Sequence, residues 1–471
     1  MTYVPREGTI PTLSVPSLQG LDRIHLIGIG GAGMSGIAHL LLARGVGVHG
    51  SDLKDSRMLA ELRRAGAVVH AGHSPENLDS PDAVVISTAI PDRNPELAEA
   101  RHRGIPVFVR IQALAALGEG KQTFGISGTH GKTTTTSMLA VILERTGRDP
   151  TYAIGGDLNE VGSGARHGDG PSFVAEADES DGSFLLLSPD VAVVTNIEAD
   201  HLDFYRGGMP EILDAFAAFF TKSKEIIVCG DDAGAREALS KAGRQATTYG
   251  LGAGNDVVLT PSDRGLGSSA GQVVIAGVTH EMVLQVPGTH NLLNATAAVI
   301  AAGHAGVPPE EAVEALKAFA GVRRRFEYRG TARGAEFYDD YAHHPTEIRA
   351  TLEAASGRGR VLAVFQPHRY SRTEALWRDL GEALGGSDVA VVTDVYAAGE
   401  EPIPGVTGKL LVDSLAESAP GKRLLYLPHR GDVVSFLTDE VRSGDLVLTL
   451  GAGDITNISE ETLERIREAD A

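Results

Sequence analysis

The chain has 471 residues and only one cysteine, Cys229. A single thiol cannot form an intramolecular disulfide, so a disulfide-stabilised secreted fold is excluded, and the low cysteine content is typical of the reducing cytoplasm. Cys229 lies at the end of the apolar run 225–229. We therefore interpret it as a buried core thiol.

Long apolar runs and long basic blocks are also missing. The longest apolar runs, such as 37–43, are far shorter than the ~20 residues that cross a bilayer. Residues 1–20 lack the apolar core of a secretory signal and are interpreted as a loose leader. A formal net charge of −20 without clustered Lys and Arg argues against a nucleic-acid surface. We expect a cytoplasmic protein with no membrane or nucleic-acid partner, either a monomer or a homodimer.

The length and the order of apolar runs predict several α/β domains. A chain of 471 residues exceeds what one hydrophobic core usually supports. Short β-branched runs alternate with helical patterns, which is typical of parallel sheets covered by helices. We predict an N-terminal Rossmann-like domain over 21–118, a central P-loop ATPase-type domain over 119–320 and a C-terminal Rossmann-like domain over 321–471. Alternating apolar positions within 255–286 predict a small antiparallel appendage on the central domain.

The first glycine-rich motif is G-x-G-x-x-G over Gly28–Gly33, between a strand and a helix predicted over 34–44, with Gly45 as its C-terminal cap. Glycines in this context let backbone amides approach a diphosphate at a helix N-terminus. Asp52, at the end of a second short strand, could accept a ribose hydroxyl. Taken alone, the motif favours a dinucleotide and leaves another nucleotide diphosphate or a structural turn as alternatives.

A second phosphate loop covers Gly125–Thr133. Lys132 would neutralise the β- and γ-phosphates, the loop amides would surround them, and the Thr133 hydroxyl would bind Mg²⁺. The glycine spacing is a variant, because the strict P-loop pattern would place glycine where Ile126 stands. Two phosphate loops predict two phosphorylated ligands.

Acidic and imidazole groups follow two further predicted strands. Glu176 comes directly after the apolar stretch 173–175, and His201 closes the segment 196–201 that follows the run 191–195. Open α/β sheets bind ligands at the carboxyl ends of their strands. Because Mg²⁺ prefers oxygen ligands, we expect Glu176 at the metal of ATP, and His201 at a second metal or beside the substrate.

Amide and basic side chains mark three further candidate positions. Asn291 and Asn294 open a predicted helix, where their amides could read an adenine edge, although a helix cap by Asn291 is the simpler local interpretation. Arg323–Phe326 offers guanidinium groups for phosphate, and Asp339–Pro345 places carboxylate, phenol and imidazole groups before a helix that starts at proline. Two arginines three positions apart then follow a predicted strand and could hold a carboxylate; they are Arg369 and Arg372.

Together these motifs resemble those of the Mur ligase family over nearly the whole chain. The segments that carry the resemblance are Gly28–Gly36, Gly128–Thr133, Glu176–Phe184 and Asp339–Glu347. The resemblance implies an ATP-dependent amide ligase of peptidoglycan precursor synthesis, which joins L-alanine to the lactyl carboxylate of UDP-N-acetylmuramic acid through an acyl phosphate, giving ADP and phosphate. The alternative within the family is the recycling activity that adds an intact tripeptide.

The resemblance also implies roles for individual residues, and it replaces the dinucleotide by UDP at the first motif. The UDP-sugar residues would be Gly30, Gly31, Ala32, Gly33, Met34, Ser35, Asp52, His73, Ser87, Thr88 and Arg110. The ATP residues would be Gly128, Thr129, His130, Gly131, Lys132, Thr133, Thr134, Asn291, Asn294, Arg325 and Asp340. Mg²⁺, or Mn²⁺ in its place, would be held by Thr133, Glu176 and His201. L-alanine would meet Tyr341, His343, Arg369 and Arg372, and the catalytic groups would be Lys132, Glu176, His201, His343 and Arg369.

Two other classes of protein account for only part of the sequence. A nicotinamide-dependent dehydrogenase would explain the first glycine motif and leave the Lys132 loop without a role. A non-catalytic ATP-binding module would explain Lys132 but not the His and Arg clusters of the third block.

Overall fold

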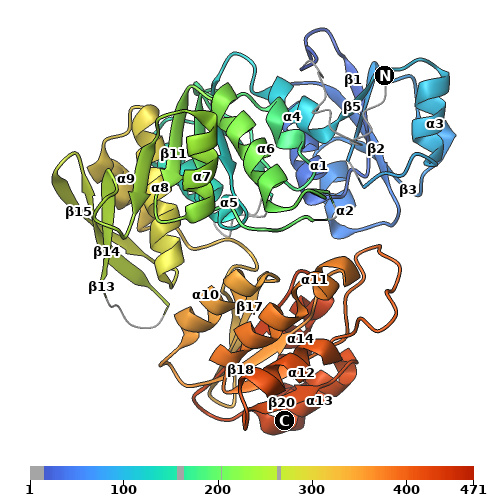
Figure 1. The fold of residues 1–471 in the computed structure, drawn as a ribbon. Helices are drawn as coiled ribbons and strands as arrows, with labels where there is room; N and C mark the ends of the chain where they lie inside the picture. The colour runs from blue at the N-terminus through green and yellow to red at the C-terminus, as the bar shows by residue number, and fades with distance from the viewer. Residues whose placement is uncertain (1–14, 88, 156–163, 203, 263–266, 471) are drawn as a thin grey trace. The chain divides into compact units, whose positions relative to one another are not determined.

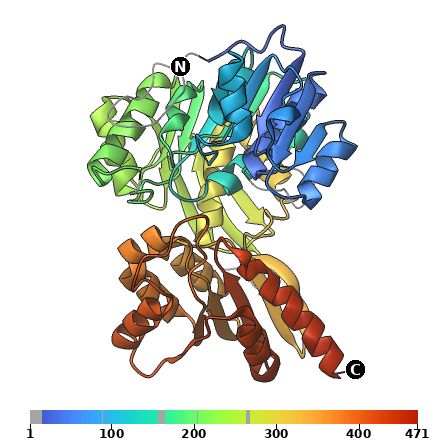
Figure 2. The same ribbon diagram turned by 90° about the vertical axis from the view of Figure 1, so that its right-hand side faces the viewer.

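The computed structural model describes residues 15–470, apart from 88, 156–163, 203 and 263–266. The described residues form two compact units. The first lies within Met1–Ser262, Ala270–Val283 and Leu292–Phe319, and the second within Asp263–Ser269, Leu284–Asn291 and Ala320–Ala471. Figures 1 and 2 show the ribbon in two views. The predicted α/β class is confirmed, because each sheet is largely parallel and covered by helices.

The first sheet is parallel, with strand order β3-β2-β1-β4-β5. Its strands are β1 (Arg23–Ile27), β2 (Gly47–Asp52), β3 (Val68–Ala71), β4 (Ala83–Ile86) and β5 (Val107–Val109). Its helices are α1 (Ala32–Ala43), α2 (Arg57–Arg64), the 3-10 helix η1 (Pro75–Asn77), α3 (Pro95–His102) and α4 (Arg110–Leu117). The predicted helix over 34–44 begins two residues earlier and ends one residue earlier, and Gly45 follows its cap with a left-handed φ of +80°.

The second sheet has the order β15-β14-β13-β12-β11-β10-β6-β9-β7-β8. Its strands are β6 (Gln122–Ser127), β7 (Thr151–Ala153), β8 (Ala165–Arg166), β9 (Ser172–Glu176), β10 (Val191–Val194), β11 (Glu225–Cys229), β12 (Thr247–Gly250), β13 (Val257–Ser262), β14 (Ser269–Ile275) and β15 (Val278–Leu284). The predicted antiparallel segment is present, since β13 and β14 pair antiparallel. It extends the central sheet, because β13 also pairs in parallel with β12.

Helices of the second sheet are α5 (Lys132–Arg145), η2 (Ser183–Leu186), α6 (Met209–Lys222), α7 (Ala233–Ala242), α8 (Thr289–His304) and α9 (Pro309–Leu316). Helix α5 is buried from Thr134 to Leu143, which places the residues of the second phosphate loop at the end of a rigid element. One continuous apolar cluster includes residues of both the first and the second sheet. Cys229 is buried, as predicted.

The third sheet lies in the second compact unit and has the order β16-β17-β21-β18-β19-β20. Its strands are β16 (Glu327–Ala332), β17 (Ala335–Asp340), β18 (Arg360–Phe365), β19 (Val389–Val392), β20 (Arg423–Tyr426) and β21 (Asp445–Leu450). Its helices are α10 (Pro345–Ala355), α11 (Tyr370–Ala383), η3 (Leu384–Gly386), α12 (Lys409–Ser418), α13 (Arg430–Glu440), η4 (Asp454–Thr456) and α14 (Asn457–Asp470). Only β16 is antiparallel to its neighbour, and apolar clusters cover both faces of this sheet.

Within the described ranges, no helix is both long and apolar enough to cross a membrane.

Candidate active site

The carboxyl ends of all five strands of the first sheet lead into predicted nucleotide residues. His73 follows β3, Asp52 ends β2, the loop 28–33 follows β1, Ser87 follows β4 and Arg110 follows β5. Parallel strands place their carboxyl ends at one edge of a sheet. The structure therefore brings these dispersed positions to a common edge.

Two glycines of the first loop leave little room for a side chain. A Cβ atom at Gly30 would lie 2.6 Å from Leu59 Cδ1, and one at Gly33 would lie 2.8 Å from an Arg110 guanidinium nitrogen. The Gly30 amide donates a 2.9 Å hydrogen bond to Asp52 Oδ2. Asp52, predicted to accept a ribose hydroxyl, thus also holds the loop in place.

Of the remaining residues predicted to bind the UDP-sugar, three lie at the start of α1 and two fall wholly or partly outside the described residues. Gly31 precedes the first turn of α1 as its N-cap, and Met34 and Ser35 are buried in that turn. Thr88 lies outside the described residues, as does the side chain of Ala32.

Arg110 connects the first sheet edge to an acidic segment of the second sheet. Its guanidinium packs over Gly33, and one of its nitrogens lies 3.6 Å from Asp178 Oδ2. Asp178 is two residues beyond the end of β9. The predicted UDP-sugar and ATP regions therefore adjoin within the first compact unit.

The second phosphate loop joins β6 to α5 through two glycines with positive φ, +126° at Gly128 and +84° at Gly131. A Cβ atom at Gly128 would collide with Thr195 Oγ1, and one at Gly131 would lie 2.5 Å from Asn294 Oδ1. These positions require glycine. The contact also places Asn294, a predicted ATP residue, beside the loop.

Asn196 holds the loop from outside, which sequence reasoning did not predict. The Thr129 amide donates to the Asn196 carbonyl at 2.9 Å, and the His130 amide donates to Asn196 Oδ1 at 2.8 Å. Asn196 Nδ2 in turn donates to the His130 carbonyl at 3.0 Å. Its position directly after a β-branched run was the only available signal.

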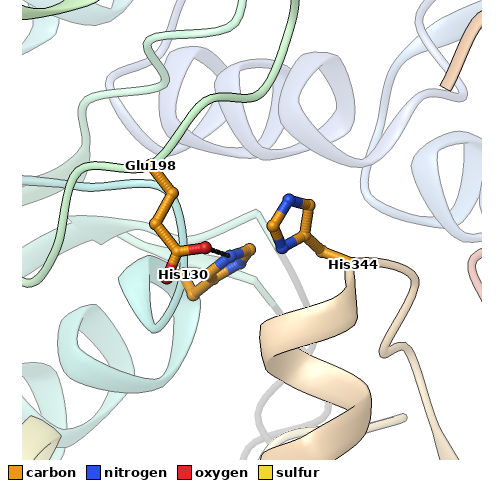
Figure 3. A group of neighbouring side chains, drawn as sticks. All are labelled: His130, Glu198 and His344. Carbon is orange, nitrogen blue, oxygen red and sulfur yellow. Dashed lines mark ion pairs between the residues drawn. The ribbon is translucent and has the colours of Figure 1, made fainter. Parts of the chain in front are cut away.

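The His130 imidazole faces a carboxylate of the same unit. His130 Nε2 and Glu198 Oε2 are 3.7 Å apart (Figure 3). The Glu198 amide donates to Thr129 Oγ1 at 2.8 Å, which adds to the Asn196 hydrogen bonds that join the loop to the segment after β10. Glu198 was also not assigned a role from the sequence.

Lys132 lies at the start of α5 and has carbonyl and carboxylate partners. Its Nζ donates to the carbonyls of Gly128 and Thr129, at 2.5 and 3.2 Å, and to Glu179 Oε1 at 2.9 Å. Burial alone would lower the pKa of Lys132, but Glu179 and Asp178 outweigh it and raise the pKa. Lys132 therefore keeps its positive charge.

Glu179 is the main unforeseen member of this cluster. Burial raises its pKa, and Lys132 opposes that rise. Oxygen Oε2 is buried and has no hydrogen-bond partner in the described part of the chain. The Tyr205 hydroxyl donates to the Glu179 carbonyl at 2.6 Å and thereby holds this segment in place.

Glu176 and Thr133 meet, as expected for two ligands of one metal. The Thr133 side chain hydrogen-bonds to Glu176, and the Gly155 amide donates to Glu176 Oε1 at 2.9 Å. Burial raises the pKa of Glu176. A bound cation would offset that burial by favouring the ionised carboxylate.

His201 follows the same sheet edge in a left-handed conformation, with φ of +55°. Its Nε2 is 3.5 Å from Asp200 Oδ2. The imidazole is close enough to act electrostatically on Asp178 and Glu179. It therefore lies near the acidic cluster, and its role at a metal or beside the substrate stays a prediction.

Within the second compact unit, Asp340 ends β17 and Tyr341 follows it, beside the arginine segment. The amides of Phe326 and Ala342 each donate to one Asp340 oxygen at 2.7 Å, and burial raises the pKa of Asp340 to about 6. The guanidinium of Arg325 lies 5.3 Å from the centre of the Tyr341 ring, within the range of a cation–π contact. Asp340 thus holds the backbone that carries Arg325.

His343 and His344 precede α10. His343 Nδ1 lies 2.9 Å from the Tyr341 carbonyl, which can only accept, so Nδ1 carries a proton. Glu347 Oε2 accepts from the His343 amide at 3.0 Å. His344, also labelled in Figure 3, is the buried N-cap of α10 in the second unit.

Arg369 and Arg372 surround a histidine that the sequence did not single out, His368. Arg369 precedes α11 with a left-handed φ of +69°, and Arg372 lies one turn into that helix, 3.4 Å from His368 Nδ1. Burial and the two arginines lower the pKa of His368 to about 4, so it is neutral at pH 7. The His368 ring stacks on Tyr396 and lies 5.9 Å from the His343 ring. The residues predicted for alanine therefore gather at one edge of the third sheet.

Two further predicted ATP residues also lie inside helices, as Lys132, Thr133 and Asn294 do. Asn291 is in the first turn of α8, where Nδ2 donates to the Pro287 carbonyl at 2.7 Å, and Thr134 is buried in α5.

The fold and this geometry define an α/β protein with a glycine loop, a phosphate loop carrying a partly buried lysine, and a carboxylate cluster between them. Three family models match the chain: "Mur ligase family, catalytic domain" over residues 23–122, "Mur ligase middle domain" over 126–302, and "Mur ligase, glutamate ligase domain" over 324–453. The chain belongs to the Mur ligase family.

Individual relatives cover nearly the whole chain. It is 48% identical over 466 residues to a UDP-N-acetylmuramate–L-alanine ligase of Mycolicibacterium vanbaalenii, covering 95% of this chain and 96% of the relative. The crystal structure of UDP-N-acetylmuramate-alanine ligase from Thermotoga maritima is similar with a TM-score of 0.81 at 31% identity, covering 95% of this chain and 99% of that one. A murein peptide ligase from Psychrobacter arcticus is similar with a TM-score of 0.69 at 25% identity, over the same shares.

Proposed function

We propose that this chain joins L-alanine to the lactyl carboxylate of UDP-N-acetylmuramic acid in peptidoglycan precursor synthesis, with conversion of ATP to ADP and phosphate. The observation that carries the proposal is 48% identity, over 95% of the chain, to a ligase named for that reaction. The tripeptide-recycling alternative is less favoured, because the murein peptide ligase is less similar in both sequence and structure than the alanine ligase. The reaction belongs to the cytoplasm, where ATP is available.

The phosphate loop supports ATP as the second substrate. Lys132 is positively charged and partly buried, and the loop glycines bring backbone amides to the N-terminus of α5, where anions are favoured. Asn294 adjoins the same loop. We assign Gly128 to Thr134, Asn291, Asn294, Arg325 and Asp340 to ATP.

The cluster near Lys132 also fits Mg²⁺. The Thr133 hydroxyl and the Glu176 carboxylate are oxygen ligands in contact, and Glu179 Oε2 is buried without a partner among the described residues. We assign Thr133, Glu176 and His201 to the metal. When bound, Mg²⁺ would neutralise phosphate charge during transfer.

In the proposed reaction, a lactyl carboxylate oxygen attacks the γ-phosphorus of ATP, the bond to the β–γ bridging oxygen breaks, and ADP leaves. Lys132 stabilises the charge on the transferring group. The neutral amine of alanine then attacks the acyl carbon, and the tetrahedral intermediate expels phosphate as the amine loses a proton. We assign Tyr341, His343, Arg369 and Arg372 to alanine. His343 is our candidate proton acceptor, because its protonated Nδ1 leaves the lone pair on Nε2 in the neutral ring.

The test is phosphate release from the purified chain with ATP, Mg²⁺ and UDP-N-acetylmuramic acid, comparing L-alanine, the tripeptide L-Ala-γ-D-Glu-meso-diaminopimelate and no amine. We expect release that needs L-alanine and is lost in Lys132→Ala. Lys121→Ala is the matched control, because Lys121 donates to the carbonyls of Gly168 and Gly170 outside the loop. Release with the tripeptide alone would refute the proposal in favour of recycling.

A further inference from the structure

A buried carboxylate, Glu96, lies beneath the nucleotide edge of the first sheet and has no role in the reaction above. It is the second residue of α3 and is fully buried.

Four hydrogen-bond donors converge on the Glu96 carboxylate. His25 Nε2 and Ser51 Oγ reach Oε2 at 3.0 and 2.5 Å, and the Ser74 amide and Asn77 Nδ2 reach Oε1 at 3.1 and 2.6 Å. These hydrogen bonds outweigh the effect of burial and lower the pKa of Glu96 to about 2, so the carboxylate is ionised at neutral pH.

The network continues from Glu96 to a predicted ligand residue. Ser51 Oγ, which donates its proton to Glu96, also lies 2.8 Å from His73 Nδ1. A serine hydroxyl has one proton, and an ionised carboxylate can only accept. The hydrogen bond between Ser51 and His73 must therefore use a proton on His73 Nδ1. Nε2 is then the nitrogen of the neutral ring that carries the lone pair.

The position of His73 relates this tautomer to ligand binding. It follows β3, two strands from the glycine loop after β1, and the Gly72 amide is bound to the Asp52 carbonyl at 2.7 Å. In sheets of this kind the diphosphate lies at the first loop, and the ribose at the end of the next strand. His73 therefore lies on the nucleoside side of the site. Its side chain is 10% exposed.

We infer that Glu96 is a positioning residue, which acts through Ser51 to fix the Nδ1-protonated tautomer of His73 and so presents Nε2 as an acceptor for a hydrogen-bond donor on the nucleoside part of the UDP ligand. The inference rests on the proposed function for the identity of that ligand. The donor is either the uracil N3–H or a ribose hydroxyl, since both are neutral donors.

Ser51→Ala is the sharpest variant, because it breaks the connection to His73 while Glu96 keeps its three other donors. Ser56→Ala is the matched control. Ser56 caps α2 in the same domain by accepting from the Leu59 amide, so its loss is purely structural. Glu96→Gln is a less selective variant. The glutamine amide nitrogen would replace one carboxylate oxygen and would then face the two donors that bind that oxygen.

The first measurement needs no substrate. In long-range ¹⁵N–¹H spectra of the full chain, with His73 assigned by comparison with His73→Gln, we expect an Nδ1-protonated ring in the native protein and in Ser56→Ala. The fixed tautomer should be lost in Ser51→Ala. An unchanged His73 signal in Ser51→Ala would overturn the inference.

The second measurement is the dissociation constant of UDP by calorimetry. We expect Ser51→Ala and His73→Ala each to weaken binding roughly fivefold, the effect of one neutral hydrogen bond. The double variant should be no weaker than His73→Ala, because both changes remove the same contact. Additive losses would overturn the inference.

Analogues identify the donor. The effect of Ser51→Ala should vanish with 3-methyl-UDP if the donor is N3–H, with 2′-deoxy-UDP if it is the 2′-hydroxyl, or with 3′-deoxy-UDP if it is the 3′-hydroxyl. Persistence with all three analogues would overturn the acceptor role of His73. A chain that binds UDP and shows this tautomer, but releases no phosphate with L-alanine, would refute the proposed function and leave the tautomer result standing.

Discussion

Arg372 and Arg378 lie on the same helix, α11, and differ in their surroundings. Arg372 lies beside His368 at the edge of the third sheet, whereas Arg378 is exposed and stacks on the neighbouring Trp377 ring at 4.6 Å. A planar guanidinium can hold a carboxylate through two parallel hydrogen bonds, and a lysine ammonium cannot. The two positions therefore separate a ligand role from a general effect of charge on this helix.

We predict that Arg372→Lys raises the KM for L-alanine by roughly 10- to 100-fold, the range for one hydrogen bond to a charged group. The KM for UDP-N-acetylmuramic acid should stay unchanged, because the proposed sugar-nucleotide residues lie on other elements. Initial rates of phosphate release over a range of alanine concentrations measure this. Arg378→Lys should behave as the native chain, and an equal rise in both variants would contradict the assignment of Arg372.

Asp340 gives a prediction about pH. Burial raises its folded-state pKa to about 6 from an ordinary value of 3.8, so between these values the folded chain binds a proton that the unfolded chain has released. Stability from this group is fully present below about pH 4 and is lost as pH rises through about 6. The loss is about 3 kcal/mol at 1.36 kcal/mol per unit of pKa. Urea unfolding at pH 4 and pH 7 should show this decrease in the native chain and not in Asp340→Asn.

At the scale of elements, the Asp232 side chain caps helix α7 and also binds the start of a second segment. Its Oδ1 accepts from the Ala235 amide at 2.7 Å, which caps α7, and from the Ile197 amide at 3.1 Å, which anchors the start of the segment leading to His201. Both bonds use the same oxygen, and burial raises the pKa of Asp232. An acceptor at this position matters more than a negative charge.

We predict that Asp232→Ala lowers the free energy of unfolding by about 1–2 kcal/mol, the usual cost of losing an N-cap. Asp232→Asn should lie within about 0.5 kcal/mol of the native chain, because an asparagine oxygen can accept both bonds. Urea unfolding of the two variants provides the comparison. Equal destabilisation would show that the carboxylate charge itself is required.

The elements themselves could be predicted because their signals are local. Runs of valine and isoleucine gave the central strands, and Pro345 marked the start of α10. The segment 255–286 was correctly expected to be antiparallel. Its connection to the central sheet, through the pairing of β13 with β12, could not be predicted. Alternating apolar and polar residues show which face of a strand is buried, but they do not show which strand lies beside it.

The site could be predicted only in part for the same reason. The phosphate loops carry their chemistry in adjacent residues, so their glycines and Lys132 were found directly. Contacts such as Lys132 with Glu179, or His25 with Glu96, join residues 47 and 71 positions apart and depend on the sheet order. Nothing local distinguishes such a carboxylate from one exposed on a helix.

At the scale of the whole molecule, the described residues divide into two compact units, and the buried carboxyl groups Glu96 and Asp340 lie one in each unit. Glu96, in the first unit, has its pKa lowered to about 2 by the donors around it despite burial, and Asp340, in the second, has its pKa raised to about 6 by burial. Stability from Glu96 is present above its ordinary pKa of 4.5 and is lost as pH falls toward 2. These two groups therefore contribute pH dependences of opposite sign to the stability of their units.

We predict two transitions in scanning calorimetry of the full chain. Glu96→Gln should lower the midpoint of one, and Asp340→Asn should change only the other. UDP should raise the midpoint that Glu96→Gln lowers, because a ligand stabilises the unit that binds it. A single transition moved by both variants would show that the two units unfold together.

The order of strands in the third sheet also affects how the chain is made. Strand β21 lies between β17 and β18, yet it is synthesised after every other strand of that sheet. During translation, β17 and β18 each keep one edge unpaired while roughly a hundred residues are added to the chain. Unpaired strand edges are sites of aggregation. A ribosome that stalls before Asp445 would therefore release a chain with two open edges in its last sheet, a substrate for chaperones and for degradation.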